Sequence, residues 1–343
     1  RYLGKEWAVG GTLPFLFKLL AASRPLSIQA HPGKEQARQG WLRENEKGIP
    51  LDAPERNYRD DNHKPEIICA LSPFTALCGF RPPPEIGSLL SRFFANAPPS
   101  LQGGFAPLLA VLANTGDGAL SALRGFLRNL FAISANLRKE LTGYVLSAPA
   151  APEFPAELWT LIRSFAELYP EDPGILSPLY LNLLRLKPGE AIYLPAGILH
   201  AYVEGFGVEL MANSDNVLRG GLSSKHLDLE ELMKILYFHP FSPELLKPPP
   251  QSPAGGFSGI FTYPSPCREF SLSLIESLEG PFPLQGPAII VVTRGCLRAT
   301  GGEGAGWELK QGESAFIPPD SPLVFGGDYT LYAASLPPPE PRP

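Results

Sequence analysis

The chain has 343 residues, of which 44% are hydrophobic and 18% charged, so it is long enough for two or three domains and too apolar to be disordered. Its net charge of −5 and its lack of a basic block exclude a general nucleic-acid binder and a membrane-surface protein, because both need clustered cations. No apolar run reaches the roughly 18 residues that span a bilayer, and four cysteines without a C-x-x-C pair indicate buried free thiols and a cytoplasmic location.

Near the start of the chain, the sequence predicts strands with one polar face. In residues 25–31 (PLSIQAH), apolar and polar residues alternate with a period of two, which places Ser27, Gln29 and His31 on one side. We interpret a strand whose polar face includes Gln and His as lining a wet or metal-binding interior. Residues 66–71 (EIICAL) are a second strand candidate.

After the proline run at residues 82–84, the pattern becomes helical. From Glu85 to about Tyr169, apolar residues recur three and four positions apart, as on one face of a helix. This predicts a helical insertion of about 85 residues. The proline-containing stretch from Ser147 to Pro155 separates its last helix from the others.

Strand patterns return from Tyr180 onward. Four short strands are expected in LNLLRL, AIYL, AYVE and GVEL, followed by one helix over Leu227–Leu236 with Asp228 near its start. A proline-rich linker over Pro240–Pro253 leads into further short strands bounded by glycines. Such strands at this spacing are typical of a barrel or sandwich.

An internal repeat links the two strand-rich regions. KPGEAIYLPAGILH begins at Lys187, and KQGESAFIPPDSPL begins at Lys310, with lysine, glycine, glutamate and proline at the same offsets. Two copies of one β-turn-β unit predict two related β-barrels. The second copy has Leu323 where the first has His200, so we expect only the first barrel to hold a metal.

The predicted fold class is therefore mainly β with a helical insertion. We expect residues 1–82 and 172–240 to form a discontinuous catalytic barrel, residues 83–171 an all-helical domain, and residues 241–343 a degenerate barrel without metal.

Four residues form a candidate metal site. Gln29 and His31 project from one strand face about 6.5–7 Å apart, so both reach one ion. His200 follows a tight turn in the pattern G-x5-P-x-G-x2-H, and Glu66 closes the run DNHKPE. Two imidazoles, a carboxylate and an amide oxygen suit Zn²⁺ with an open position. Taken alone, Gln29 is more typical of a surface residue, and the other three histidines have no such frame.

Long segments resemble the type I mannose-6-phosphate isomerase family of the cupin superfamily. The matching segments are LPFLFKLL, RPLSIQAHPGKEQA, DDNHKPEIICALSPFTALCGFRP, YLPAGILHAY and ELMANSDNVLRGGLSSKHLD, which begin at Leu13, Arg24, Asp60, Tyr193 and Glu209. The resemblance implies two cupin-type barrels or jelly rolls, and one zinc ion bound by the four residues above. The family's opening strands are absent or shortened here.

The resemblance also implies an active site. It places the family's active-site arginine at Arg219 and adds other residues lining the cleft: Lys18, Ser27, Lys64, Glu209, Asp215 and Lys225. Aldose–ketose isomerisation moves a proton between C2 and C1 through a cis-enediol, which needs an acid–base group and a cation. Lys64 could act as the base or pair with the substrate phosphate, Arg219 could stabilise the enediolate or bind phosphate, and Lys225 and Ser27 are possible phosphate contacts.

The expected reaction interconverts mannose 6-phosphate and fructose 6-phosphate and supplies mannose and GDP-mannose metabolism. Another metal-cupin enzyme, such as an Fe(II) dioxygenase, is an alternative, although iron sites prefer more histidines. A non-catalytic sugar-phosphate-binding cupin is a second alternative. The expected partner is a small sugar phosphate, with neither nucleic acid nor membrane, and a monomer is expected without excluding an oligomer.

Overall fold

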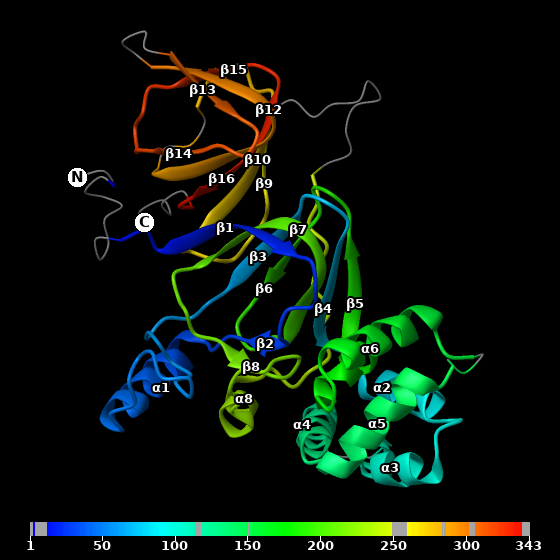
Figure 1. The fold of residues 1–343 in the computed structure, drawn as a ribbon. Helices are drawn as coiled ribbons and strands as arrows, with labels where there is room; N and C mark the ends of the chain where they lie inside the picture. The colour runs from blue at the N-terminus through cyan, green and yellow to red at the C-terminus, as the bar shows by residue number, and fades with distance from the viewer. Residues whose placement is uncertain are drawn as a thin grey trace.

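The computed structural model describes residue 3 and residues 12–113, 118–149, 151, 153–248, 259–282, 284, 286–301 and 306–337. Two eight-stranded sheet systems stack on one another, and a group of helices packs beside the first (Figure 1). The predicted fold class is confirmed. The three domain ranges given above stay a prediction.

The first barrel is built around one long, bent strand. Its strands are β1 (Phe15–Ala22), β2 (Gln29–Ala30), β3 (Glu66–Ala70), β4 (Phe74–Phe80), β5 (Leu181–Leu186), β6 (Ala191–Leu194), β7 (His200–Ala212) and β8 (Leu218–Arg219). The first part of β7 pairs with β2 and β4, and its last part pairs with β1 and β3. The strand bends at Gly205, which has φ 135° and where a Cβ would lie 2.8 Å from the Cα of Phe74.

Two strand predictions were wrong in this barrel. The strand expected over residues 25–31 is reduced to β2, because only Gln29 and Ala30 find ladder partners, on β7 and β8. The segments AYVE and GVEL are parts of the single strand β7, because the glycines between them bend the strand instead of ending it. The sequence analysis also missed β1, β4 and helix α1.

The helices cover one end of this barrel. Beside α1 (Lys34–Glu46) and α8 (Leu229–Ile235), the helical group comprises α2 (Pro83–Phe93), α3 (Pro99–Ala113), α4 (Gly118–Phe131), α5 (Ala135–Ser147), α6 (Ala156–Leu168), a 3₁₀ turn (Pro173–Leu176) and α7 (Ser177–Tyr180). Their apolar faces share one core with barrel residues such as Ile28, Leu77 and Leu199. The helix predicted near residue 228 is confirmed as α8, and the Asp228 carboxylate accepts the N–H of Glu231 at 2.9 Å.

The second barrel also contains a strand that joins two sheets. Its strands are β9 (Gly259–Thr262), β10 (Ser271–Glu276), β11 (Gly280–Pro281), β12 (Ala288–Thr300), β13 (Gly306–Lys310), β14 (Ser314–Ile317), β15 (Val324–Gly326) and β16 (Tyr329–Ser335). Strand β12 pairs with β14 and β16 in its first part and with β13 and β15 in its last, and its register shifts between Val292 and Arg294. Gly295 lies within β12 and does not end it, although the sequence pattern predicts short strands bounded by glycines here.

The internal repeat has the same backbone geometry in both barrels. The Glu190 carboxylate accepts the N–H of Lys187 at 2.8 Å, and the Glu313 carboxylate accepts the N–H of Lys310 at 2.7 Å. Backbone φ angles of 84° and 87° occur at the equivalent Gly189 and Gly312, and of 81° and 57° at the equivalent Gly197 and Asp320. The repeated letters therefore encode a repeated turn.

The barrels share a hydrophobic core. Ile67 of β3 and Val208 and Leu210 of β7 pack with residues of the second barrel, among them Tyr263 and Phe270. Figure 1 shows the second barrel stacked on the side of the first that carries β1 and β7. The close packing fixes the outer faces of β3 and β7 against the second barrel.

The cysteines are free thiols. Cys69, Cys78 and Cys267 are buried as expected, whereas Cys296 is half-buried. Within the described part of the chain, no helix is both long and apolar enough to cross a membrane.

Candidate metal centre

Three ligand-type side chains from three strands meet inside the first barrel. His31, directly after β2, places its Nε2 3.2 Å from Glu66 Oε1 at the start of β3. His200, the first residue of β7, places its Nε2 3.5 Å from Glu66 Oε2. All three side chains are buried, and their ligand atoms lie within 4.8 Å of one another. Among the described residues, no other group of three His, Cys, Asp or Glu converges in this way.

Gln29 is the fourth residue of the cluster. Its side-chain amide lies 3.5 Å from His200 Nε2, and it pairs with His200 across the β2–β7 ladder. A half-turn of the amide group exchanges its nitrogen and oxygen, so the carbonyl oxygen can face the same centre. The structure thus brings together the four residues predicted as ligands.

The two histidines are oriented for metal binding. The Nδ1 of His31 lies 2.7 Å from the carbonyl oxygen of Asn216, and the Nδ1 of His200 lies 2.9 Å from that of Ile198. A carbonyl only accepts, so each neutral ring carries its proton on Nδ1 and turns the Nε2 lone pair toward Glu66. Within the described residues, His31 Nε2 and Glu66 Oε2 are buried without a hydrogen bond. Two unsatisfied lone-pair atoms facing one point fit a bound cation.

The local electrostatics keep the ligands in the forms that bind metals. Burial lowers the pKa of His31, which favours the neutral ring. Burial acts to raise the pKa of Glu66, but the positive charge of the adjacent Lys64 favours the carboxylate, and the pKa of Glu66 lies well below its usual value. The Nζ of Lys64 lies 3.2 Å from Glu66 Oε1, and its side chain is buried. Lys64 therefore stands directly beside the candidate ligands, as predicted.

Two more predicted residues, the exposed Lys18 and the buried Glu209, lie opposite each other on neighbouring strands. Lys18 on β1 and Glu209 on β7 are register partners, and Lys18 Nζ lies 3.6 Å from the sulfur of Met211. Burial, followed by the negative charge of Glu66, raises the pKa of Glu209 to about 8. At neutral pH a carboxyl group with this pKa keeps its proton and can donate a hydrogen bond.

The remaining predicted residues are partly buried or exposed. Arg219 on β8 is the ladder partner of Gln29, is partly buried, and has its pKa lowered by burial and by Arg59. Ser27 is partly buried two residues before Gln29. The side chains of Asp215 and Lys225 are exposed, so the structure does not place them in the buried ligand cluster.

Sequence reasoning missed a residue that organises the centre, Asn216. Its backbone carbonyl binds His31, and its fully buried amide side chain accepts the N–H of Arg59 at 2.7 Å and donates to the carbonyl of Asn62 at 2.9 Å. These hydrogen bonds hold the segment that leads to Glu66 in place. The run N-S-D-N before Arg219 was the available signal, because short polar residues there are typical of loops that bind backbone.

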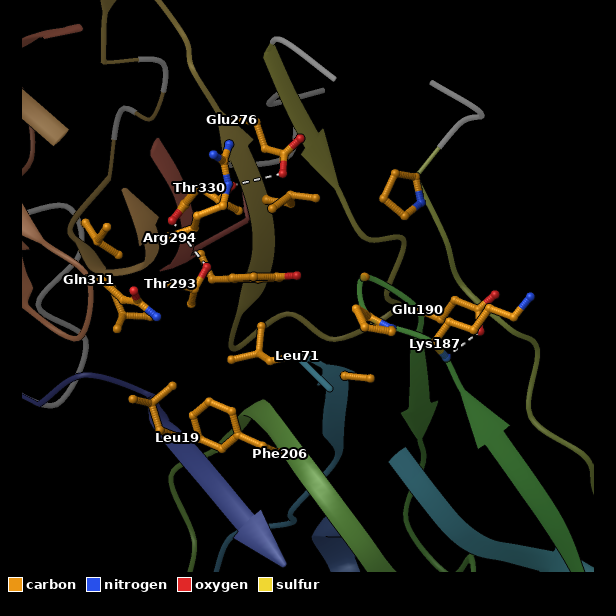
Figure 2. Close-up of a pocket in the computed structure, with 18 of the residues that line it drawn as sticks. Leu19, Leu71, Lys187, Glu190, Phe206, Glu276, Thr293, Arg294, Gln311 and Thr330 are labelled. Atoms are coloured by element: carbon orange, nitrogen blue, oxygen red, sulfur yellow. Dashed lines mark hydrogen bonds between the residues drawn. The ribbon is translucent and has the colours of Figure 1, made fainter. Parts of the chain in front are cut away.

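A large cavity lies elsewhere, between the two barrels (Figure 2). It has a volume of about 910 Å³, and Leu19, Leu71 and Phe206 form its first-barrel side, opposite Arg294 and Thr330 of the second. None of the predicted site residues lines it. The candidate centre is thus defined by buried ligand atoms and lies apart from this cavity.

Comparisons with known proteins show the family of this chain. A model of the catalytic domain of type I phosphomannose isomerase matches residues 3–83. The chain is 40% identical over 325 residues to mannose-6-phosphate isomerase of Escherichia coli (strain K12), which covers 92% of this chain and 77% of that protein. It is 35% identical over 328 residues to the Bos taurus enzyme, which covers 90% and 73%. A crystal structure of zinc-bound mannose 6-phosphate isomerase aligns with a TM-score of 0.83 and 37% identity, covering 98% of this chain and 82% of that one. The chain belongs to the type I phosphomannose isomerase family.

Proposed function

We propose that this chain interconverts mannose 6-phosphate and fructose 6-phosphate, with one Zn²⁺ held by Gln29, His31, Glu66 and His200. The observation that carries the proposal is the pair of Nδ1-to-carbonyl contacts, which aim both imidazole Nε2 atoms at the buried Glu66 carboxylate. Two imidazoles, a carboxylate and an amide oxygen suit zinc with an open position. When bound, the ion would polarise the substrate oxygens at C1 and C2.

Lys64 is proposed to move the proton between C2 and C1. Its Nζ lies 3.2 Å from Glu66 Oε1, which places the amine among the ligands, where the reacting carbons would be held. The phosphate, on the sixth carbon of the sugar, would lie farther from the ligands than the reacting carbons C1 and C2. The position of Lys64 therefore favours proton transfer over phosphate binding.

Glu209 is proposed to bind a substrate hydroxyl as a hydrogen-bond donor. Its carboxyl group is buried, and its pKa of about 8 keeps it protonated at neutral pH. Lys18, its ladder partner on β1, is exposed and supplies a positive charge beside it. Together they can orient the open-chain sugar relative to Lys64.

The phosphate is proposed to bind at the rim. Arg219 is permanently charged and partly exposed, so it can contact the phosphate or the oxygen that becomes negative in the enediolate. Ser27 precedes Gln29, the ladder partner of Arg219, by two residues, and Lys225 offers an exposed ammonium group. We also propose that the reaction takes place in the cytoplasm and supplies mannose and GDP-mannose metabolism.

A coupled assay of mannose 6-phosphate conversion tests the proposal. We expect activity in the zinc-loaded protein, loss of activity after exhaustive chelation, and recovery when zinc is restored. Activity that survives chelation would contradict the zinc assignment. A fully metal-loaded chain that binds sugar phosphate without forming an isomer would contradict catalysis.

A second experiment tests the role of Lys64. Lys64→Met should abolish exchange of the substrate C2 proton with solvent while zinc remains bound. Arg219→Lys is the matched comparison, because it keeps a cation but loses the planar fork, and it should weaken turnover without abolishing the exchange. Near-normal exchange in Lys64→Met would rule out Lys64 as the base.

A further inference from the structure

The segment at residues 59–65 carries Lys64 to the site and leads directly into the ligand Glu66. One side of it is held by the first barrel itself, through the amide side chain of Asn216. Ser214 adds a hydrogen bond from its hydroxyl to Asp60 Oδ1 at 2.8 Å. The segment has no strand or helix of its own, so these side-chain contacts determine its position.

The other side of the segment is held by the second barrel. His63, which directly precedes Lys64, contacts a carboxylate oxygen of Glu269 through its Nε2. Both side chains are about three-quarters buried, with exposed fractions of 26% and 25%. This contact joins the second barrel to the chain segment beside the candidate metal ligands.

Glu269 is itself firmly placed. Its second carboxylate oxygen accepts a hydrogen bond from the Cys267 thiol at 3.1 Å, and burial raises the pKa of that thiol to about 12, so the donor proton is retained. Cys267 and Phe270, on either side of Glu269, are 7% and 1% exposed in the core shared by the two barrels. Ile67, next to Glu66, belongs to the same core. Both ends of the connection are therefore anchored in one packed unit.

We propose that Glu269 is a positioning residue for the isomerase reaction, which acts through His63 to hold Lys64 and Glu66 in register with each other. The inference rests on the function proposed above. Glu269 lies on the second barrel and touches none of the predicted ligands, so its effect on the reaction is indirect. Misplacing a catalytic group by about 1 Å can cost on the order of 100-fold in rate, which gives a single tether a measurable effect.

The test compares Glu269→Gln with a matched control, Glu308→Gln. Glu308 is also a carboxylate of the second barrel and pairs with Arg298 Nε at 3.1 Å, but it does not contact residues 59–65. For Glu269→Gln we expect kcat to fall about 10-fold while KM changes less than about 2-fold. Hydrogen–deuterium exchange of the amides of residues 59–64 should quicken about 10-fold, with full zinc content and an unchanged rate in the helices. The control should match the wild type in all these measurements.

A double variant shows whether Glu269 acts through His63. If it does, His63→Gln combined with Glu269→Gln should be no slower than His63→Gln alone. A full additional loss in the double variant, or unchanged kcat and unchanged exchange in Glu269→Gln, would overturn the proposal. If the zinc-loaded wild type does not isomerise the sugar, the proposed function fails, and the exchange comparison at residues 59–64 alone decides whether the tether exists.

Discussion

The two barrels share one turn but differ in what fills them. The turn after Lys187 and the turn after Lys310 have matching glycines and matching carboxylate-to-amide hydrogen bonds. In the first barrel the repeat ends on the buried His200, and in the second it ends on the partly exposed Leu323. The residues that shape the turn are thus present in both copies, whereas the histidine that would bind metal is present only in the first.

The interiors show why one ligand alone would not make a second site. The second barrel is filled by its own hydrophobic cluster, with Val292, Phe325 and Leu331 among its buried members. The first barrel also has an interior cluster but leaves one end to Gln29, His31, Glu66 and His200, where His31 Nε2 and Glu66 Oε2 are buried without a hydrogen bond to any described residue. A metal centre requires several strands to carry polar ligands instead of apolar side chains at the same place.

The largest expected effect comes from making the first barrel resemble the second. His200→Leu should lose zinc and more than about 100-fold of the activity, because it removes a ligand from the centre. Metal analysis and the isomerase assay check this, with the exposed His239→Leu as control. A His200→Leu protein that keeps a full zinc complement would break the comparison.

The next effect concerns the hydrogen bonds by which Asn216 holds the segment that leads to Glu66. Asn216→Ala keeps the backbone carbonyl at His31 but leaves the N–H of Arg59 without its side-chain acceptor. We expect a loss of about 1–3 kcal/mol in unfolding free energy and about 10–100-fold weaker zinc binding. Urea unfolding and competition with a zinc chelator measure the two. Unchanged zinc affinity would show that these hydrogen bonds contribute to folding only.

A paired substitution tests whether the two turns are equivalent. Glu190→Ala and Glu313→Ala each remove a carboxylate that accepts one backbone N–H. Because the geometry is the same, both should lower the unfolding free energy by a similar amount, about 1 kcal/mol. Unfolding measured in urea compares them directly. A clear difference in size would show that the turns contribute unequally to folding.

The pH dependence of stability tests the contact between His63 and Glu269, which joins the two barrels. The hydrogen bond with His63 is the main cause that lowers the pKa of Glu269 from 4.5 to about 2. A carboxylate with a lowered folded-state pKa adds stability above its unfolded value, and this is lost as the pH falls from about 4.5 toward 2. The stability advantage of wild type over Glu269→Gln, about 1 kcal/mol or less at neutral pH, should therefore vanish across this window. An advantage that grows on acidification would be the contrary result.

The smallest expected effect is the reverse exchange in the second barrel. Leu323→His restores the ligand type at the equivalent position, but the interior beside it is apolar. We expect zinc stoichiometry to stay at one per chain in metal analysis. A second bound zinc would mean that the turn frame alone suffices for a site.

Sequence reasoning named four residues that the structure brings together, but it misjudged several strands around them. His200 was found because a tight turn with left-handed backbone at Gly197 delivers it to a strand start, and that turn is written in the local sequence. Helix α1 was missed because its sequence is mostly charged and polar, and only Ala37, Gly40 and Glu44 are buried. The course of β7 was misread because a glycine can bend a strand or end it, and only the pairing on both sides decides which. The contact with Glu269 joins residues 206 positions apart, which no local pattern encodes.

The bent strand β7 has a consequence for how this family can vary in length. Beyond the bend, Glu209 points into the barrel while its neighbours Val208 and Leu210 point into the core between the barrels. Adding or deleting one residue near Gly205 would exchange the two faces, placing a carboxylate in the hydrophobic core and two aliphatic side chains in the site. Insertions should therefore accumulate in the loops and be excluded from this stretch.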